Sequence, residues 1–329
     1  MITNSHKFQV SASLAPAQTD SKMPTASSTT CRPTGELSDS YETIQKAEAY
    51  SKVALPLTEL KGNKAGEIYA LKMKYRDIMV QRYGTTPTSY MVTENIVGEV
   101  RPGVLYQIGE FGLKPNHKPN ALLEKNIEAQ TPPLVRIPTR WSKKQCQATQ
   151  EANILGRNDS IFVKETRYEI PVAPTTPEYL AYYGVKLLNF GESIQFESDG
   201  PMPITKMKVG KDYPHHYLQE KNRGGGFYIE GHDRPHFHMP VNKQAGGYLI
   251  LGKQISVGEL ALSAFSIPYG QAIYTPPWVL HDDAFLHGDL FVVYSKTERY
   301  STGIFRTASN DETVRFTVEA NPIPQSADD

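Results

Sequence analysis

The sequence predicts an all-β core preceded by an N-terminal extension that contains a few helices. Ten short runs of strand composition follow Gly184, and most of them are separated by Gly, Pro, Asp or Asn. Many short strands at close spacing are typical of an antiparallel sandwich or barrel. No long helical pattern interrupts them, which argues against a doubly wound parallel sheet. The runs are GVKLLNF, ESIQFES, PITKMKV, GFYIEG, GYLILG, LALSAFSI, QAIYT, LFVVYS, GIFRTA and VRFTVEA.

Three regions are expected along the chain. Residues 1–36 are rich in Ser, Thr, Ala and Pro, so they cannot bury enough apolar surface to offset the entropy of ordering, and they predict a flexible leader. Residues 37–183 predict a helical and irregular extension. Residues 184–329 predict the β core.

Helices are expected at three places in the extension. The first is residues 41–54, with Pro56 beyond its end, and the second is residues 64–83, where apolar residues recur every three or four positions. The third is residues 177–183, which Thr176 precedes as a capping residue. Residues 89–168 have no regular pattern and are expected to be irregular.

Composition limits the classes of partner. Lys and Arg together number 35, as do Asp and Glu, so the formal net charge is zero. No basic run predicts a nucleic-acid surface or contact with anionic lipid. No apolar run approaches the roughly 18–20 residues needed to span a membrane, and the first residues lack the pattern of a signal peptide. We therefore expect a cytoplasmic protein with a small-molecule partner and no nucleic-acid or membrane partner, and a homodimer is left open.

Histidines gather in one part of the chain. Seven of the nine lie between residues 215 and 287, and the stretch HDRPHFHMP holds three of them. His236 and His238 are two residues apart, so on a strand both side chains point to the same face. His281 follows the bend TPP and is the third candidate. Imidazole is the commonest metal ligand, so the clustering predicts a metal site.

These residues resemble the cupin family. The second cupin motif reads Gly-x5-Pro-x-Gly-x-x-His, and Gly270, Pro276 and His281 match its spacing, with Trp278 in place of the internal Gly. The first motif carries a His-x-His pair, a Glu and a later Gly. The HFH triplet matches its His pair, and the strand GGYLILG resembles the segment that ends at its glycine. The resemblance covers about residues 184–320.

The resemblance implies one divalent transition metal held by three histidines, with Fe(II) favoured and Zn(II), Mn(II) or Ni(II) as alternatives. The expected ligands are His236, His238 and His281. Where cupins usually place the ligating Glu this chain reads NKQAGG, so Gln244 is the only oxygen ligand expected there, and a weak one.

Other residues are assigned to the surroundings of the metal. Asp282 and Asp283 are candidates for a general base or for hydrogen bonds to the ligands, and Arg234 for binding a carboxylate or phosphate, with an ordinary surface arginine as the alternative. His232 and His287 are expected beside the metal or on the surface, not as ligands. The expected substrate pocket is formed by Trp278, Tyr248 and Tyr274, with core packing as the alternative for aromatic residues in these strands.

The favoured function is a metal-dependent enzyme acting on a small, anionic or oxygen-rich metabolite, as a three-His non-haem iron dioxygenase. The first alternative is a metal-dependent isomerase or lyase. The second is a non-catalytic cupin that binds a ligand. A metal-free structural cupin is a weaker third alternative, because such proteins usually have two barrels.

Overall fold

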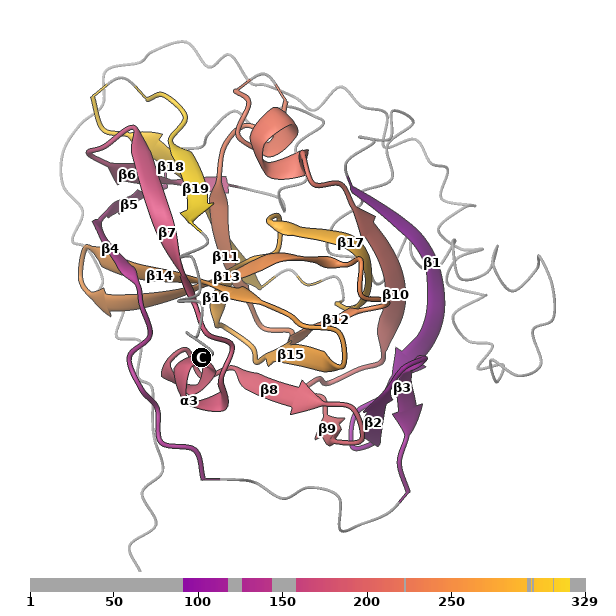
Figure 1. Ribbon diagram of the computed structural model, residues 1–329. Helices are drawn as coiled ribbons and strands as arrows, with labels where there is room; N and C mark the ends of the chain where they lie inside the picture. The colour runs from indigo at the N-terminus through magenta and orange to yellow at the C-terminus, as the bar shows by residue number, and fades with distance from the viewer. Residues whose placement is uncertain are drawn as a thin grey trace, which may run out of the picture.

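The computed structural model describes residues 91–117, 126–143, 158–221, 223–294, 297, 299–309 and 311–319 (Figure 1). The predicted leader and the predicted helices at residues 41–54 and 64–83 lie outside these residues. Within the described ranges, no helix has both the length and the apolar character needed to cross a membrane.

Six strands form a first layer in which all neighbours are antiparallel. In spatial order they are β1 (Met91–Val100), β10 (Met202–Val209), β17 (Leu286–Val293), β12 (His236–Pro240), β15 (Gln271–Thr275) and β8 (Lys186–Asn189).

Seven strands form a second layer, antiparallel except for β18 and β6. In spatial order they are β14 (Glu259–Ser266), β13 (Gly246–Ser256), β16 (Leu280–Asp282), β11 (Tyr228–His232), β18 (Tyr300–Thr307), β6 (Asn158–Val163) and β5 (Arg140–Ser142). In Figure 1 the first layer ends at β1 on the right, and the second reaches β5 and β6 at the upper left.

The two layers are hydrogen-bonded to each other at one corner. The first residues of β13 pair with β17 through Gly246 with His287 and Gly247 with Leu286. Gly247 has φ +81°, and a Cβ there would lie 2.1 Å from the carbonyl oxygen of Phe285, so only glycine permits this approach. The strand order is otherwise open, with β5 and β8 at its ends. The closed barrel that the sequence predicted is therefore not formed by the described strands, because the interior is enclosed by two facing layers.

The expectation of irregular structure between residues 89 and 168 is wrong for most of the described part. This region contributes β1, β5 and β6 to the two layers, and β4 (Val135–Pro138) pairs with β14. β7 (Arg167–Ala173) runs parallel to β14 and to β19 (Arg315–Glu319). A separate small sheet has the order β3 (Gly112–Pro115), β2 (Leu105–Gly109) and β9 (Ser193–Gln195). β2 and β3 form a local hairpin, but β1, β4, β6, β7 and β9 pair with strands distant in sequence, so a local pattern does not reveal most of these pairings.

Apolar side chains form three clusters, one between the layers and one on each outer face. The interlayer cluster includes Leu290 and Val292 of the first layer and Leu249 and Leu251 of the second. The outer clusters lie beneath the small sheet and beneath β4, β7 and β19. The central strands are buried on both faces, which explains why their sequences read as nearly continuous apolar runs.

The local predictions in the β region are confirmed. Each of the ten predicted runs contains a strand. The helix expected at residues 177–183 is α3 (Pro177–Tyr182), and the Thr176 side chain accepts a hydrogen bond from the backbone N–H of Tyr179 at 3.3 Å. Gly184, with φ +77°, follows its end. The other helical element of the described residues is a π-helical turn, η3 (Pro214–Leu218).

Candidate metal centre

Four buried side chains meet between the layers where β11 turns into β12. Glu230, His232, His236 and His281 each offer one ligand atom, and these atoms all lie within 4.8 Å of one another. None of the four residues is more than 5% exposed. We call this group the Glu-His cluster.

Strand pairing explains how these residues come together. Glu230 of β11 and His281 of β16 are directly opposite in an antiparallel pair, so their side chains lie on one face. His232 is two residues beyond Glu230 and shares that face. The turn at residues 233–235 then carries the chain from the second layer to the first, where His236 begins β12. The cluster therefore joins the two layers.

Backbone carbonyl groups orient two of the imidazole rings. His232 Nδ1 lies 2.6 Å from the carbonyl oxygen of Arg234, and His281 Nδ1 lies 2.9 Å from that of Val279. A carbonyl oxygen only accepts hydrogen bonds, so each Nδ1 carries the proton and donates it. Each Nε2 is left with a lone pair, and this tautomer suits a metal ligand.

The distances within the cluster fit a ligand set that lacks its central ion. His281 Nε2 lies 3.0 Å from His236 Nδ1 and 3.8 Å from Glu230 Oε1. The Nε2 atoms of His232 and His236 are buried and have no hydrogen-bond partner among the described residues. Buried polar atoms are rarely left unpaired. Two such nitrogen atoms beside a carboxylate match the donor types that divalent transition metals prefer.

Burial keeps these rings neutral at neutral pH. Loss of solvation lowers the pKa of His232 to about 3 and that of His281 to about 4, and it lowers the pKa of His236 well below its usual value. Neutral imidazole is the form that binds metals. The approach of Glu230 to His281 is therefore a contact with an uncharged ring and not an ion pair.

Two buried hydroxyl groups flank the cluster. Thr275 is paired with His236, and Thr302 is paired with Glu230. Directly opposite residues share a face, so both threonines face the space between the layers. Neither Oγ1 has a hydrogen-bond partner in the part of the chain that the structure describes. These hydroxyl groups can therefore bond to a molecule bound at the cluster.

The four ligands expected from the sequence occupy different positions. His236 and His281 belong to the Glu-His cluster, and His238 lies beside it on the same face of β12. His238 Nε2 is 3.4 Å from Asp283 Oδ2, and the Tyr228 hydroxyl donates to the other oxygen of Asp283 at 3.3 Å. Gln244 is exposed in the turn between β12 and β13, outside the cluster.

Two of the three aromatic residues expected in the pocket face away from the cluster. Tyr274 belongs to the outer cluster of the first layer, and its hydroxyl accepts the N–H of Glu197 at 3.0 Å. Tyr248 packs against the outer cluster of the second layer. Trp278 is close to the site through its backbone, because its N–H donates to the carbonyl of His232 at 2.7 Å, while its side chain is largely exposed.

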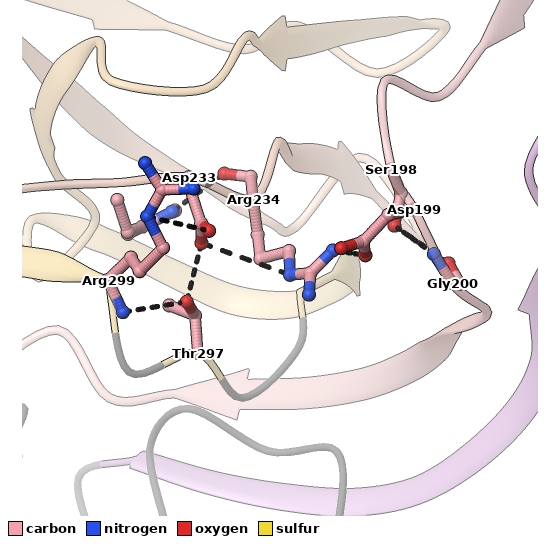
Figure 2. Close-up of polar contacts among 8 residues, drawn as sticks. Ser198, Asp199, Gly200, Asp233, Arg234, Thr297 and Arg299 are labelled. Carbon is pink, nitrogen blue, oxygen red and sulfur yellow. Dashed lines mark hydrogen bonds and ion pairs between the residues drawn. The ribbon is translucent and has the colours of Figure 1, made fainter.

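The three remaining candidates are not members of the Glu-His cluster. The Asp282 carboxylate accepts the N–H of Ala284 at 2.5 Å. His287 lies on β17, opposite Gly246 in the strand pair that joins the layers. Arg234 lies in the turn between β11 and β12 and forms an ion pair with Asp199 (Figure 2).

Glu230 was not expected at the site, and His232 was expected only beside it. A signal for both is present in the sequence. Glu230 and His232 have the same i, i+2 spacing as His236 and His238, within the strand-like run YIEGH. The cupin pattern has its carboxylate after the His pair, whereas the structure places Glu230 before it.

Comparisons of this chain with protein-family models, curated proteins and solved structures find no significant match. The assignment of the site therefore rests on its own geometry.

Proposed function

We propose that the Glu-His cluster binds one divalent transition metal and that the chain is a metal-dependent enzyme with a cupin-like core. The observation that carries the proposal is the pair of buried, unpartnered Nε2 atoms of His232 and His236, which lie beside the carboxylate of Glu230. A purely structural polar cluster would be expected to pair these atoms.

Two features support the cupin-like part of the proposal. Trp278 has φ +67°, a left-handed conformation that favours glycine, and the cupin motif has glycine at this position. His281, at the end of that motif, belongs to the Glu-His cluster. The carboxylate comes from β11 and not from the segment after the His pair, so this ligand set would be a variation on the cupin pattern.

The donor set favours the metals expected from the sequence. Three imidazoles and one carboxylate suit Fe(II), Zn(II), Mn(II) and Ni(II), and the carboxylate reduces the charge of the bound centre by one. A metal bound in this way supplies Lewis acidity and, as Fe(II), the capacity to react with O2 at positions left for other ligands. We favour Fe(II) and a dioxygenase acting on a small anionic metabolite. Thr275 and Thr302 would bind and orient the substrate through their hydroxyl groups.

One observation favours the isomerase or lyase alternative. His238, Asp283 and Tyr228 form a buried hydrogen-bonded series on the inner side of the layers, beside the cluster. Such a series can hold a proton at His238 Nε2 or at an Asp283 oxygen and exchange it with a substrate. These reactions need proton transfer but no O2.

Metal binding tests the proposal directly. The full chain, freed of metal by chelation and dialysed against Fe(II) without oxygen, should bind close to one ion per chain. Nitric oxide should then give a high-spin iron–nitrosyl signal, because the centre leaves a position for an added ligand. Glu230→Gln and His281→Ala should lose most of the metal, whereas His287→Ala is the matched control and should keep it.

Full metal retention in both Glu230→Gln and His281→Ala would refute the centre. Oxygen consumption with a panel of small carboxylic acids separates the reaction classes, because only the dioxygenase requires O2.

A further inference from the structure

Arg234 lies in the turn that connects two residues of the Glu-His cluster. It lies in the turn between His232, the last residue of β11, and His236, the first residue of β12. Its carbonyl oxygen accepts the hydrogen bond from His232 Nδ1 at 2.6 Å. The backbone of Arg234 therefore already orients a proposed ligand, and its side chain starts from the same turn.

Surrounding residues hold the turn firmly. The Asp233 carboxylate accepts a hydrogen bond from the Thr297 hydroxyl at 2.5 Å and lies 3.8 Å from the Arg299 guanidinium. The backbone N–H of Asp233 donates to the carbonyl of Arg299 at 3.1 Å. Figure 2 shows Asp233 between the two arginines, with Thr297 beneath it. Asp233 is thus engaged by other groups and serves to fix the turn.

The guanidinium of Arg234 is incompletely paired. Its Nε is buried, lies 3.9 Å from the nearer Asp233 oxygen, and has no hydrogen-bond partner among the residues described. Its Nη1 forms an ion pair with Asp199, which reaches it from the segment between β9 and β10 (Figure 2). A guanidinium binds a carboxylate best through two parallel N–H bonds. Arg234 therefore retains capacity for a second, better-placed acceptor.

Asp199 is suited to being displaced. Its side chain is 78% exposed, whereas that of Arg234 is only 21% exposed. Ion pairs with a well-solvated partner contribute little to stability, because water replaces the contact at small cost. A carboxylate that arrives with a bound molecule can therefore take the place of Asp199 without disturbing the fold.

We propose that Arg234 binds a carboxylate group of the substrate beside the metal and that Asp199 occupies this position when no substrate is present. The inference rests on the proposed metal centre and names the class of substrate as a small carboxylate. A carboxylate is favoured over other anions because the group that now pairs with Arg234 is itself a carboxylate. Binding exchanges one ion pair for another, so no net charge is left unpaired at the turn.

The test uses the full chain loaded with Co(II) and titrated with succinate. Calorimetry and the visible spectrum of the metal both measure succinate binding. Arg234→Gln should weaken succinate binding by at least about tenfold, because a charge-assisted interaction is lost. Asp199→Asn should strengthen binding by about two- to fivefold, because the internal competitor is removed. Arg299→Gln removes an equal charge from a residue that contacts the same turn through Asp233, and it is the control, with a change of less than about twofold.

The outcomes separate the two proposals. Absence of Co(II) from the unmodified chain would refute the metal centre, and it would also refute the role of Arg234 in binding substrate beside that centre. Full Co(II) content with equal succinate affinity in Arg234→Gln and the unmodified chain would refute the role of Arg234 alone. Loss of Co(II) from Arg234→Gln would assign this residue to holding the turn and not to the substrate. Tighter binding of inorganic phosphate than of succinate, with the same dependence on Arg234, would refute the carboxylate assignment.

Discussion

The two faces of β12 are both fully buried but chemically opposite. His236 and His238 point between the layers, and Phe237 and Met239 point into the outer cluster beneath the small sheet. Exposure does not distinguish the faces, since none of these residues is more than 5% exposed. The neighbours distinguish them. The inward face meets a carboxylate and other imidazoles, whereas the outward face meets aromatic rings, such as that of Phe196, whose centroid lies 5.9 Å from the centroid of the Phe237 ring. The comparison separates residues that stabilise the fold from those proposed to bind metal.

The inward face itself holds two different environments. His236 Nδ1 lies 3.0 Å from His281 within the Glu-His cluster, whereas His238 contacts Asp283. A His-x-His pair on a strand therefore places two rings on one side without making both of them ligands. The difference depends on which residue lies across from each ring, His281 for His236 and Asp283, two residues later, for His238.

The largest expected effect is on the outward face. Phe237→Ala should lower the free energy of unfolding by about 3–5 kcal/mol, because a fully buried ring is removed from a packed cluster. It should leave the metal content unchanged. Urea denaturation of the metal-free protein and metal analysis measure the two properties separately. Phe237→Leu, which keeps an apolar side chain, should lose less stability, and loss of metal in Phe237→Ala would remove the distinction between the faces.

The second prediction compares the histidines on either side of His236. His232→Ala should weaken metal binding by more than about a hundredfold, because changes to groups that only orient a ligand already cost about 10–100-fold. His238→Ala should weaken metal binding by no more than about 10–100-fold. Competition with a chelator measures both affinities. The reverse order would make the His236–His238 pair the true ligand pair.

The third prediction concerns pH. The folded-state pKa values of His232 and His281 are about 3 and about 4, below the usual 6.5, so the unfolded chain takes up protons first as the pH falls. The stabilising contribution is complete above pH 6.5 and is lost as the pH falls, down to about 4 for His281 and about 3 for His232, by about 1.4 kcal/mol per pH unit for each histidine. Metal-free protein should therefore unfold at lower urea concentration at pH 5 than at pH 7. His281→Gln should reduce this dependence, and equal stability at both pH values would contradict the burial of neutral rings.

The smallest effect is expected at Trp278, where the chain crosses between the layers after β15. Its φ of +67° is unfavourable for a residue with a side chain, and the ring is 52% exposed. Trp278→Gly should therefore change the free energy of unfolding by no more than about 1 kcal/mol, in the stabilising direction. Trp278→Ala keeps the unfavourable φ and should be less stable than Trp278→Gly, as urea denaturation would measure. A clear loss of stability in the glycine variant would mean that the ring packs more tightly than its exposure suggests.

Local pattern was sufficient for the elements of the β region and for part of the site. Short apolar runs between turn residues identified the strands, because backbone propensity and the spacing of turns act over a few residues. The capping residue and the following glycine identified α3 in the same way. His236 and His281 were singled out by the clustering of imidazoles and by the motif around Pro276.

The sequence by itself determined the alternation of side chains along each strand. It therefore determined that Glu230 shares a face with His232 and that His236 shares a face with His238. Only the tertiary structure decided which of these faces looks between the layers and which rings meet there. Tyr274 and Tyr248 belong to the opposite faces of their strands, although they lie close to the site in sequence. The physical reason is that the period of a strand is local, whereas the identity of the strand across the interior depends on pairings such as Glu230 with His281, which are 51 residues apart (281 − 230).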